Sequence, residues 1–564
     1  MFQSLAKTRA GCRRLFPRHL LHRLTTLATC VVATLVSQFI YAQTVNAESG
    51  ERPNIVYIMA DDLGIGDVEC FGGDRCQIDT PGFDRLASEG VKFTDAHAPA
   101  SVCVPTRVGI MTGRYAWRFS RPRPDGPWGF LNPRLKPGSL TLPAMLRKAG
   151  YRTGYVGKWH LGTQMPTKNG ENQGPTNVDY TKPLLVGPRQ YGLDESFILP
   201  GSLDMFPYVY VRNNRFVGEV TAQRGWSAFN RVGPAADDFE DFEVLDHFSA
   251  EAEKFLERQA KQKQPFFLYV ALTAPHTPVS PSERFRGKSR IGPYGDFVMD
   301  ADNCIVRVLN ALDKHRLTEN TLVIVTSDHG PALYAGDIPQ ATPNQLRKLE
   351  KKGHYASGVY RGYKFSAYEG GLRVPLVARW PGVTPAASTS SGVVGLHDLY
   401  RTLAEVAGVA VGDDVAGDSV SYAPLLKNPA AASPRSDIVL RSTNSFVIRK
   451  GRWKLLLCPG SGCAGRFGNS PPRDEAWRAA VEAHGERVAG QAQLAQAPFV
   501  QLFDLENDPG EQNNLAVKHP ERVKSMVTLL TKQIDAGRST PGPRLNNDRP
   551  ITPFAGVPAF VLKK

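Results

Sequence analysis

Three continuous apolar runs stand out in the pattern of hydrophobic and polar positions. They cover residues 54–60, 265–272 and 321–326, and none of them alternates with polar side chains. Unbroken runs of this length predict strands that are buried on both faces, as in a parallel sheet. Helical periodicity appears between and beyond them, at 82–89, 143–149, 246–262, 294–315 and 397–407. This alternation predicts an α/β fold with a mostly parallel central sheet flanked by helices.

The pattern changes after a linker rich in Gly, Ala, Pro and Ser at about 410–435. Shorter strand-like runs follow at 438–441, 446–457 and 500–505, with a helical pattern at about 519–537. They predict a small C-terminal α+β unit with an antiparallel sheet. We therefore expect a large domain over 48–430 and a smaller one over 431–564. Two segments with weak periodicity, 163–240 and 331–362, are interpreted as long insertions over the functional face of the large domain.

The first 47 residues have the order of a secretory signal peptide. A basic region ends at Arg23, an apolar stretch covers 24–42, and small residues recur up to Ala47. The alternative is an uncleaved membrane anchor, because the apolar stretch approaches the length that spans a bilayer. The Thr, Ser and Gln residues within the stretch favour cleavage. We expect an exported protein, periplasmic or secreted.

Composition and charge are those of an ordinary globular protein. The chain has 564 residues, 41% hydrophobic and 22% charged, with a formal net charge of +14. The leader contributes six basic side chains and no acidic one, so +8 remains on the rest of the chain. No cluster of Lys and Arg with interleaved aromatic residues occurs. We therefore expect no nucleic-acid partner.

Six of the eight cysteines lie beyond the leader. Cys70 and Cys76 form one close pair, and Cys458 and Cys463 form another. In an exported protein, such pairs predict short-loop disulfides. Cys304 lies in a helical pattern, which predicts a buried thiol. Cys103 has no cysteine near it in the sequence.

Cys103 precedes Pro105 and a helical stretch that runs from Val108 to Gly113. Proline suits the first turn of a helix, so Cys103 is placed at a helix N-terminus. Free N–H groups and the helix dipole favour anions at such a position. On this pattern alone, an ordinary buried cysteine is an equally good interpretation.

Polar residues follow the predicted strands. Asp61 and Asp62 follow the run at 54–60, Asp328 and His329 follow the run at 321–326, and His276 follows the run at 265–272. The carboxyl ends of parallel strands share one edge of a sheet, where sites form. Converging carboxylates suit Ca²⁺ or Mg²⁺, although each of these residues alone is compatible with a helix cap or a solvated turn.

A further pair of polar residues, Lys158 and His160, lies two positions apart in a segment expected to be extended. Side chains with this spacing point to the same side of an extended chain. An isolated Lys-x-His pair is usually solvated, so the spacing alone does not indicate a site.

The segment from Cys103 to Arg114 carries a longer motif. It reads Cys-Val-Pro-Thr-Arg-Val-Gly-Ile-Met-Thr-Gly-Arg and resembles the Cys-x-Pro-Ser/Thr-Arg motif of the type I sulfatases, in the alkaline phosphatase superfamily. The resemblance covers about 51–540 and implies an alkaline-phosphatase-like fold. It also implies that a separate formylglycine-generating enzyme oxidises Cys103 to Cα-formylglycine. The gem-diol of the hydrated aldehyde would attack sulfur, and the sulfated hemiacetal would collapse to release sulfate.

The same resemblance implies roles for the other positions. It makes Asp61, Asp62, Asp328, His329 and the modified Cys103 ligands of one Ca²⁺, and Arg107 the partner of the formylglycine and the ligand carboxylates. Lys158 and Lys364 would bind sulfate, His160 would orient the formylglycine hydroxyl, and His276 would contact sulfate or protonate the leaving group. Many sulfatases have Asn where this chain has His329. Imidazole matches Ca²⁺ less well, which leaves Mg²⁺ as an alternative.

The sequence predicts hydrolysis of a sulfate ester, on a sulfated carbohydrate or an aryl sulfate. One alternative is a phosphodiester or phosphonate monoester hydrolase of the same superfamily, and another is a non-enzymatic binder of sulfated glycans. Basic residues also crowd a Pro-rich stretch near Trp117 and Trp128, namely Arg118, Arg121, Arg123 and Arg134. Some of them are hypothesised to meet anionic sugars beside the scissile sulfate, with a role in solubility equally compatible. The sequence does not fix the oligomeric state.

Overall fold

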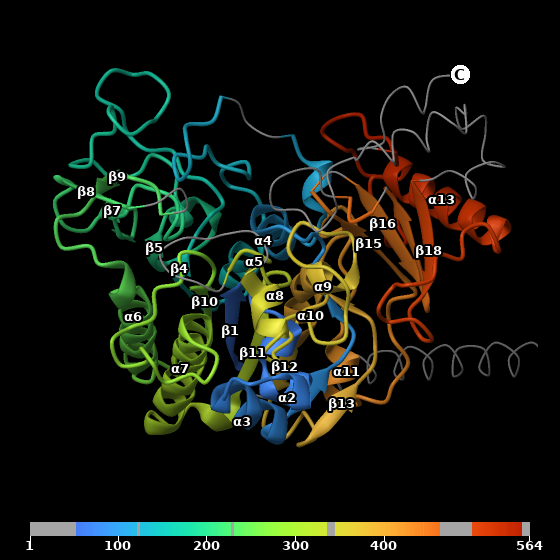
Figure 1. The fold of residues 1–564 in the computed structure, drawn as a ribbon. Helices are drawn as coiled ribbons and strands as arrows, with labels where there is room; N and C mark the ends of the chain where they lie inside the picture. The colour runs from blue at the N-terminus through green and yellow to red at the C-terminus, as the bar shows by residue number, and fades with distance from the viewer. Residues whose placement is uncertain are drawn as a thin grey trace, which may run out of the picture. The chain divides into compact units, whose positions relative to one another are not determined.

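A ten-stranded mixed sheet forms the centre of the computed structural model (Figure 1). The structure describes residues 52–120, 124–226, 230–335, 345–443, 445–458, 460–462 and 499–554. The strands follow the order β13 (Ser388–Ser390), β2 (Val91–Phe93), β12 (Leu376–Arg379), β11 (Thr321–Ser327), β1 (Asn54–Asp61), β10 (Phe266–Pro275), β4 (Arg152–Lys158), β5 (Glu195–Leu199), β6 (Val211–Arg212) and β7 (Arg215–Phe216).

The middle of this sheet is parallel. β1 pairs in parallel with β10 and β11, and β4 and β5 continue the parallel order beyond β10. Every residue of β1, β10 and β11 is buried. This is the burial on both faces that the three apolar runs predict, so the predicted α/β class is confirmed.

Helices cover both faces of the sheet. α3 (Pro81–Glu89), α6 (Val244–Gln259) and α7 (Pro293–Lys314) pack together, and α6 and α7 contact β10. A second group contains α4 (Cys103–Thr112), α5 (Leu142–Lys148) and α10 (Leu399–Val406), and α5 contacts β4. Each of the five helical patterns found in the sequence corresponds to one of these helices.

A separate four-stranded antiparallel sheet lies near the C-terminus. It contains β15 (Asp437–Arg441), β16 (Phe446–Lys450), β17 (Trp453–Leu457) and β18 (Val500–Asp504), and α13 (Pro520–Asp535) packs on it (Figure 1). The single run expected at 446–457 is two strands. The chain turns at Gly451, whose φ of 56° suits glycine, and the two apolar halves pair with each other.

Residues 53–564 form one compact unit, so the boundary expected between 430 and 431 stays a prediction. The signal peptide expected at 1–47 lies outside the described residues. Among the described residues, no helix combines the length and apolar character needed to cross a membrane.

The interpretation of 163–240 as an insertion is wrong for part of its length. β5 lies within this segment and extends the parallel core beside β4. It has only five residues and stands among Gly, Pro and Asn, so it gives no clear periodic signal. The segment also contains the short strands β6, β7, β8 (Ala222–Arg224) and β9 (Gly233–Ala235).

The prediction of a Cys70–Cys76 disulfide is wrong. Both thiols are free. The Sγ atom of Cys76 faces the Ile78 carbonyl oxygen at 3.4 Å, while the backbone N–H of Cys70 donates to Asp84. The two cysteines thus belong to different local hydrogen-bond groups. Cys463, the expected partner of Cys458, lies outside the described residues. Cys304 is buried in α7, as predicted.

Candidate active site

Polar side chains meet at one edge of the parallel core. Asp61 and Asp62 stand at the end of β1, Lys158 ends β4, His276 follows β10 and Asp328 follows β11. These four strands run parallel, so they deliver their side chains to the same edge. All five residues are buried. The common direction of the four strands therefore brings these residues into one site.

Cys103 begins α4, as the sequence predicts, and Val102 before it is extended, with φ −147° and ψ 141°. The side chain is 3% exposed, and its Sγ atom lies 3.2 Å from Nε2 of His329. Burial raises the pKa of the Cys103 thiol above its usual range, although Lys364 and Lys158 act to lower it. An unmodified thiol here is therefore protonated at neutral pH and a weak nucleophile.

Four potential metal ligands converge in the site, and Cys103 is one of them. Ligand atoms of Asp61, Cys103, Asp328 and His329 all lie within 4.8 Å of one another. Nδ1 of His329 lies 2.9 Å from the Gly330 carbonyl oxygen, which places the proton on Nδ1. Its Nε2 lies 3.3 Å from Asp62 Oδ1 and 3.5 Å from Asp328 Oδ1, so the ring nitrogen and the two carboxylates converge. Oxygen-rich donors and an oriented imidazole fit a divalent cation.

A close backbone approach fixes the loop that follows His329. A Cβ atom on Gly330 would lie 1.9 Å from the Gly370 carbonyl oxygen, so only glycine fits. The Gly330 N–H also donates to the Gly371 carbonyl oxygen at 3.1 Å. Nearby, the Lys364 N–H donates to the Pro331 carbonyl oxygen at 2.8 Å. The loop that follows His329 and the loop that contains Lys364 are therefore held together by backbone contacts.

Two lysines are paired with the first two aspartates. Lys158 Nζ lies 2.5 Å from Asp61 Oδ2, and Lys364 Nζ lies 2.7 and 2.8 Å from the two oxygens of Asp62. Burial acts to raise the pKa of Asp61, but Lys158, His276 and Arg107 hold it well below its usual value. Burial dominates at Asp62 and raises its pKa to about 6 against the effect of Lys364. Each of these two lysines thus forms an ion pair with one aspartate of the site.

Arg107 links α4 to the strand ends. Its Nη2 atom donates to Asp61 Oδ1 at 3.3 Å and to Asp328 Oδ2 at 3.1 Å, and Nη1 donates to the Lys158 carbonyl oxygen at 3.1 Å. The side chain is 1% exposed. These contacts hold two potential ligands and the end of β4 in place from α4.

The local geometry expected at Lys158 and His160 is wrong, although both residues do reach the site. β4 ends at Lys158, and His160 has a φ of 51°, so the segment is not extended. Burial lowers the pKa of His160 well below its usual value, and the positive charges of Lys158, Arg107 and Lys364 add to the effect. Its Nδ1 atom is buried without a hydrogen-bond partner among the described residues.

His276 stands between the aspartates and a further acidic residue. Its Nδ1 donates to the Thr277 carbonyl oxygen at 2.6 Å, and its Nε2 lies 3.8 Å from Asp62 Oδ2. Burial, Lys364 and Lys158 lower the pKa of His276 well below its usual value. It is therefore neutral in the free protein, with its Nε2 lone pair directed toward the site.

Sequence reasoning missed Asp204. This residue is 6% exposed, and its Oδ1 lies 3.9 Å from His276 Nδ1. It follows β5, whose Leu199 is in register with Lys158. The signal that could have found it is a carboxylate just beyond a parallel strand, but β5 itself was not predicted.

The arginines that follow α4 do not form one group. Arg118 is fully buried and pairs with Asp418 at 2.8 Å, so it is not one of the arginines that could meet a substrate. Arg121 and Arg123 lie outside the described residues. Arg134 pairs with Asp125 at 2.9 Å and lines a cavity of about 410 Å³ beside Val104 and Pro105.

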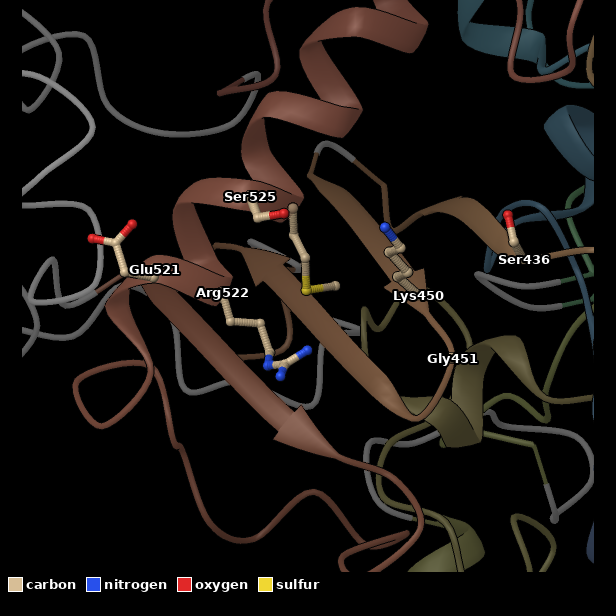
Figure 2. Close-up of a pocket in the computed structure, with 7 residues that line it drawn as sticks. Ser436, Lys450, Gly451, Glu521, Arg522 and Ser525 are labelled. Atoms are coloured by element: carbon tan, nitrogen blue, oxygen red, sulfur yellow. The ribbon is translucent and has the colours of Figure 1, made fainter.

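A different groove lies on the small C-terminal sheet. Figure 2 shows it between α13 and β16, lined by Ser436, Lys450, Gly451, Glu521, Arg522 and Ser525. None of the predicted site residues lines this groove, and Arg522 stacks over Trp453 at 4.4 Å. Its arrangement gives no reason to place chemistry there.

The sequence matches the Sulfatase family model over residues 53–409. The chain belongs to the sulfatase family. This sulfatase is 31% identical to the N-acetylgalactosamine-6-O-sulfatase of Bacteroides thetaiotaomicron, over 86% of this chain and 94% of that protein. It is 28% identical to the N-acetylgalactosamine-6-sulfatase of Canis lupus familiaris, over 89% of both chains.

Solved structures agree with the fold. A structure from work on the metabolism of multiple glycosaminoglycans by Bacteroides thetaiotaomicron superposes with a TM-score of 0.71 at 30% identity. The match covers 86% of this sulfatase and 99% of that chain. The PsFucS1 sulfatase of Pseudoalteromonas sp. superposes with a TM-score of 0.64 at 20% identity, over 87% of this chain and 92% of that one, and so supports the fold.

These matches decide between the predicted reaction classes. The sulfatase is a sulfuric ester hydrolase, and its reaction is the hydrolysis of sulfate esters. They give no support to the alternatives of a phosphodiester or phosphonate monoester hydrolase and of a binder without activity. The predicted fold, a large mostly parallel sheet with a small antiparallel one, is confirmed.

Proposed function

We propose that this sulfatase removes sulfate from a sulfated saccharide, with a formylglycine formed from Cys103 and a Ca²⁺ ion held by Asp61, Asp62, Asp328 and His329. One observation carries the proposal. Cys103 Sγ and His329 Nε2 lie 3.2 Å apart within a buried cluster of carboxylates. This contact supports a nucleophile and a cation site at the same point.

The surroundings of Cys103 support its conversion to formylglycine. Its raised thiol pKa makes direct attack by a thiolate unfavourable. When formed, the hydrated aldehyde supplies one hydroxyl to attack sulfur and a second whose deprotonation expels sulfate. The conversion requires a formylglycine-generating enzyme as a maturation partner. Position 103, at the first residue of α4, places the side chain where the helix dipole favours developing negative charge.

The cation site is assigned to Ca²⁺ because the donor set is rich in carboxylate oxygens. His329 is the one nitrogen ligand, and its Nδ1–H bond to Gly330 fixes the ring with Nε2 facing the cluster. A bound cation would polarise a sulfate oxygen and favour the ionised form of the nucleophile. Mg²⁺ is the alternative, because it also prefers oxygen donors.

Lys158 and Lys364 bind the sulfate group in this proposal. A sulfuryl group in transfer spreads negative charge over its oxygens, and two fixed ammonium groups stabilise that charge. Burial opposes the charged form of both lysines. Asp61 nevertheless raises the pKa of Lys158 above its usual value, and Asp62 does the same for Lys364. Both are therefore charged and positioned before the substrate arrives.

The two histidines divide the remaining tasks. His160 orients the nucleophilic hydroxyl, and His276 delivers a proton to the leaving oxygen. The low pKa of His276 in the free protein follows from burial and the nearby lysines. An anionic sulfate ester between those lysines and His276 offsets their charge, which raises the pKa of His276 when the acid is needed.

Saccharide substrates are supported by the relatives. Two of them are N-acetylgalactosamine 6-sulfatases, at 31% and 28% identity over most of both chains. We therefore place a 6-O-sulfated N-acetylgalactosamine first among substrates to be tested. The signal peptide expected at 1–47 directs the sulfatase out of the cytoplasm, to the periplasm or beyond, where such glycans occur.

The proposal is tested by comparing three substrates on enzyme produced together with a formylglycine-generating enzyme. They are N-acetylgalactosamine 6-sulfate, 4-nitrophenyl sulfate and bis(4-nitrophenyl) phosphate, with Cys103→Ala as the control. We expect hydrolysis of both sulfates, the saccharide being preferred, and no turnover by the variant. Preference for the phosphate diester, or equal activity in the variant, would overturn the proposal.

A further inference from the structure

Asp204 occupies a position in the site that none of the assigned roles explains. It is 6% exposed, and its Oδ1 atom is buried without a hydrogen-bond partner among the described residues. A buried carboxylate oxygen without such a partner is costly unless a ligand supplies one. The nearest catalytic group is His276, whose Nδ1 lies 3.9 Å away but already donates to the Thr277 carbonyl oxygen.

The other side of Asp204 is firmly held. Nη1 of Arg231 donates to Asp204 Oδ2 at 3.1 Å and to the Asp204 carbonyl oxygen at 2.6 Å. Met205 N–H donates to the Ser202 carbonyl oxygen at 3.1 Å, which closes a tight turn around the aspartate. The carboxylate is therefore fixed in place. Its Oδ2 accepts a hydrogen bond from Arg231, and its Oδ1 accepts none from the described residues.

Arg231 connects this turn to an exposed aromatic side chain. Its guanidinium carbon lies 3.6 Å from the ring centroid of Trp128, and Trp128 is 45% exposed. Trp128 also has a φ of 53°, an uncommon conformation for a bulky residue. Three separate segments thus meet at one border of the site, where Arg231 links the apolar ring of Trp128 to the carboxylate of Asp204. Sugar-binding sites use this combination, because a saccharide has apolar C–H faces and hydroxyl donors.

We propose that Asp204, Arg231 and Trp128 form the subsite for the ring that carries the scissile sulfate, with Asp204 Oδ1 accepting a hydrogen bond from a ring hydroxyl. The inference rests on the proposed function, because it takes the sulfated group to be a saccharide. A planar phenol offers no hydroxyl at this position. The subsite therefore selects hydroxylated rings over aryl sulfates.

The alternative role for Asp204 is to act through His276. The largest influences on the pKa of His276 are burial, Lys364, Lys158 and Asp61, and the Nδ1 proton is already taken by Thr277. The geometry thus favours a contact with substrate. The two roles differ in outcome, because a partner of His276 affects every substrate equally.

The test uses Asp204→Asn, which keeps an acceptor for Arg231 and can replace the unpartnered acceptor by a donor. The kcat/KM ratio of N-acetylgalactosamine 6-sulfate to 4-nitrophenyl sulfate is measured in wild type and variant. We expect the ratio to fall about 10- to 100-fold, the usual effect of one hydrogen bond to a charged group. Trp128→Ala, at an exposed position, is expected to raise KM for the saccharide and to lower the same ratio.

Asp238→Asn is the matched control, because Asp238 is an exposed aspartate that follows β9. It should leave the ratio unchanged. An Asp204→Asn variant that loses activity on both substrates equally, or on neither, would overturn the subsite. If wild-type enzyme hydrolyses neither sulfate ester, the proposed function fails instead, and the two failures are therefore distinct.

Discussion

His329 Nε2 lies 3.2 Å from Cys103 Sγ, although the two residues are 226 positions apart in the chain. One residue follows β11 and the other begins α4, so the contact depends on the packing of α4 against the edge of the sheet. The imidazole is oriented by its bond to Gly330. The contact places the proposed nucleophile beside the proposed cation site, and the predictions below test the parts of that arrangement.

Removal of the divalent cation should abolish activity and lower stability. Without a cation, the clustered carboxylates form ion pairs with Arg107, Lys158 and Lys364, and the negative charge of the cluster lacks the divalent counterion. Activity and melting temperature are measured after chelation and after addition of Ca²⁺ or Mg²⁺. A cation at 100 times its Kd stabilises the folded state by about 2.7 kcal/mol. Full activity in excess chelator would contradict the assignment.

His329→Ala tests the nitrogen ligand directly. We expect the Ca²⁺ concentration for half-maximal activity to rise more than about tenfold. Loss of a residue that only orients a metal ligand already lowers metal affinity by about 10- to 100-fold. His329→Asn retains an oxygen donor and should need less Ca²⁺ than His329→Ala. Identical Ca²⁺ requirements in wild type and both variants would remove His329 from the site.

Lys364→Ala should lower kcat/KM on sulfate esters by about 10²- to 10³-fold, because one fixed positive charge near the transferring group is lost. The cation proposed beside Asp62 limits the effect on folding. Lys263→Ala, at an exposed lysine, is the control and should have no effect. Steady-state kinetics on 4-nitrophenyl sulfate decide the matter, and a loss of less than threefold at Lys364 would contradict sulfate binding by this side chain.

Gly157 sets the approach of β4 to β10, and Gly157→Ala tests it. An added Cβ would lie 1.8 Å from the Ala271 carbonyl oxygen, and φ is 117°. We expect a loss of more than about 3 kcal/mol, because backbone atoms must move and a positive φ alone costs about 1–2 kcal/mol. Gly138→Ala is the matched control, with φ 79° and no atom within 4 Å of the added Cβ. Equal stability of the two variants in denaturant unfolding would refute the steric explanation.

His397 should make the sulfatase sensitive to acid. Burial lowers its pKa from 6.5 to about 4, and Arg435, which donates to its Nε2 at 3.2 Å, adds to the effect. The unfolded chain therefore binds a proton between pH 6.5 and 4 that the folded protein does not. Folding stability should fall as pH drops through this window, by about 3 kcal/mol from this residue. Above pH 6.5 the residue makes no pH-dependent contribution.

The measurement is the free energy of unfolding of wild type and His397→Asn at pH 7 and pH 4.5. Other groups also titrate in this range, so the difference between the two proteins is the quantity of interest. The stability of the variant should decrease less with acid than that of wild type. Parallel curves for the two proteins would show that His397 is not the sensor.

The sequence predicted the centre of the fold because its strands are long and wholly apolar. β1, β10 and β11 are buried on both faces, and a run of seven or more buried residues gives an unambiguous pattern. β5 and β12 were not predicted, because each has five residues or fewer. The loss of β5 also hid Asp204, since the rule that sites form at strand ends needs the strand first.

Other errors arose from contacts that no local pattern encodes. Arg118 pairs with Asp418, which is 300 positions away, so its burial could not be read from its neighbours. The positive φ of His160 broke the extended segment on which its expected direction rested. Lys158 and His160 nevertheless reach the site, because β4 ends at the same edge as β1 and β10.

The central claim is that Cys103 is the precursor of the catalytic nucleophile, and peptide mass spectrometry tests it most directly. The peptide containing residue 103 is analysed in active enzyme from a host that contains a formylglycine-generating enzyme, and the extent of conversion is compared with kcat. We predict formylglycine at position 103, with kcat in proportion to the converted fraction. A fully active enzyme that keeps an intact Cys103 thiol would contradict the account.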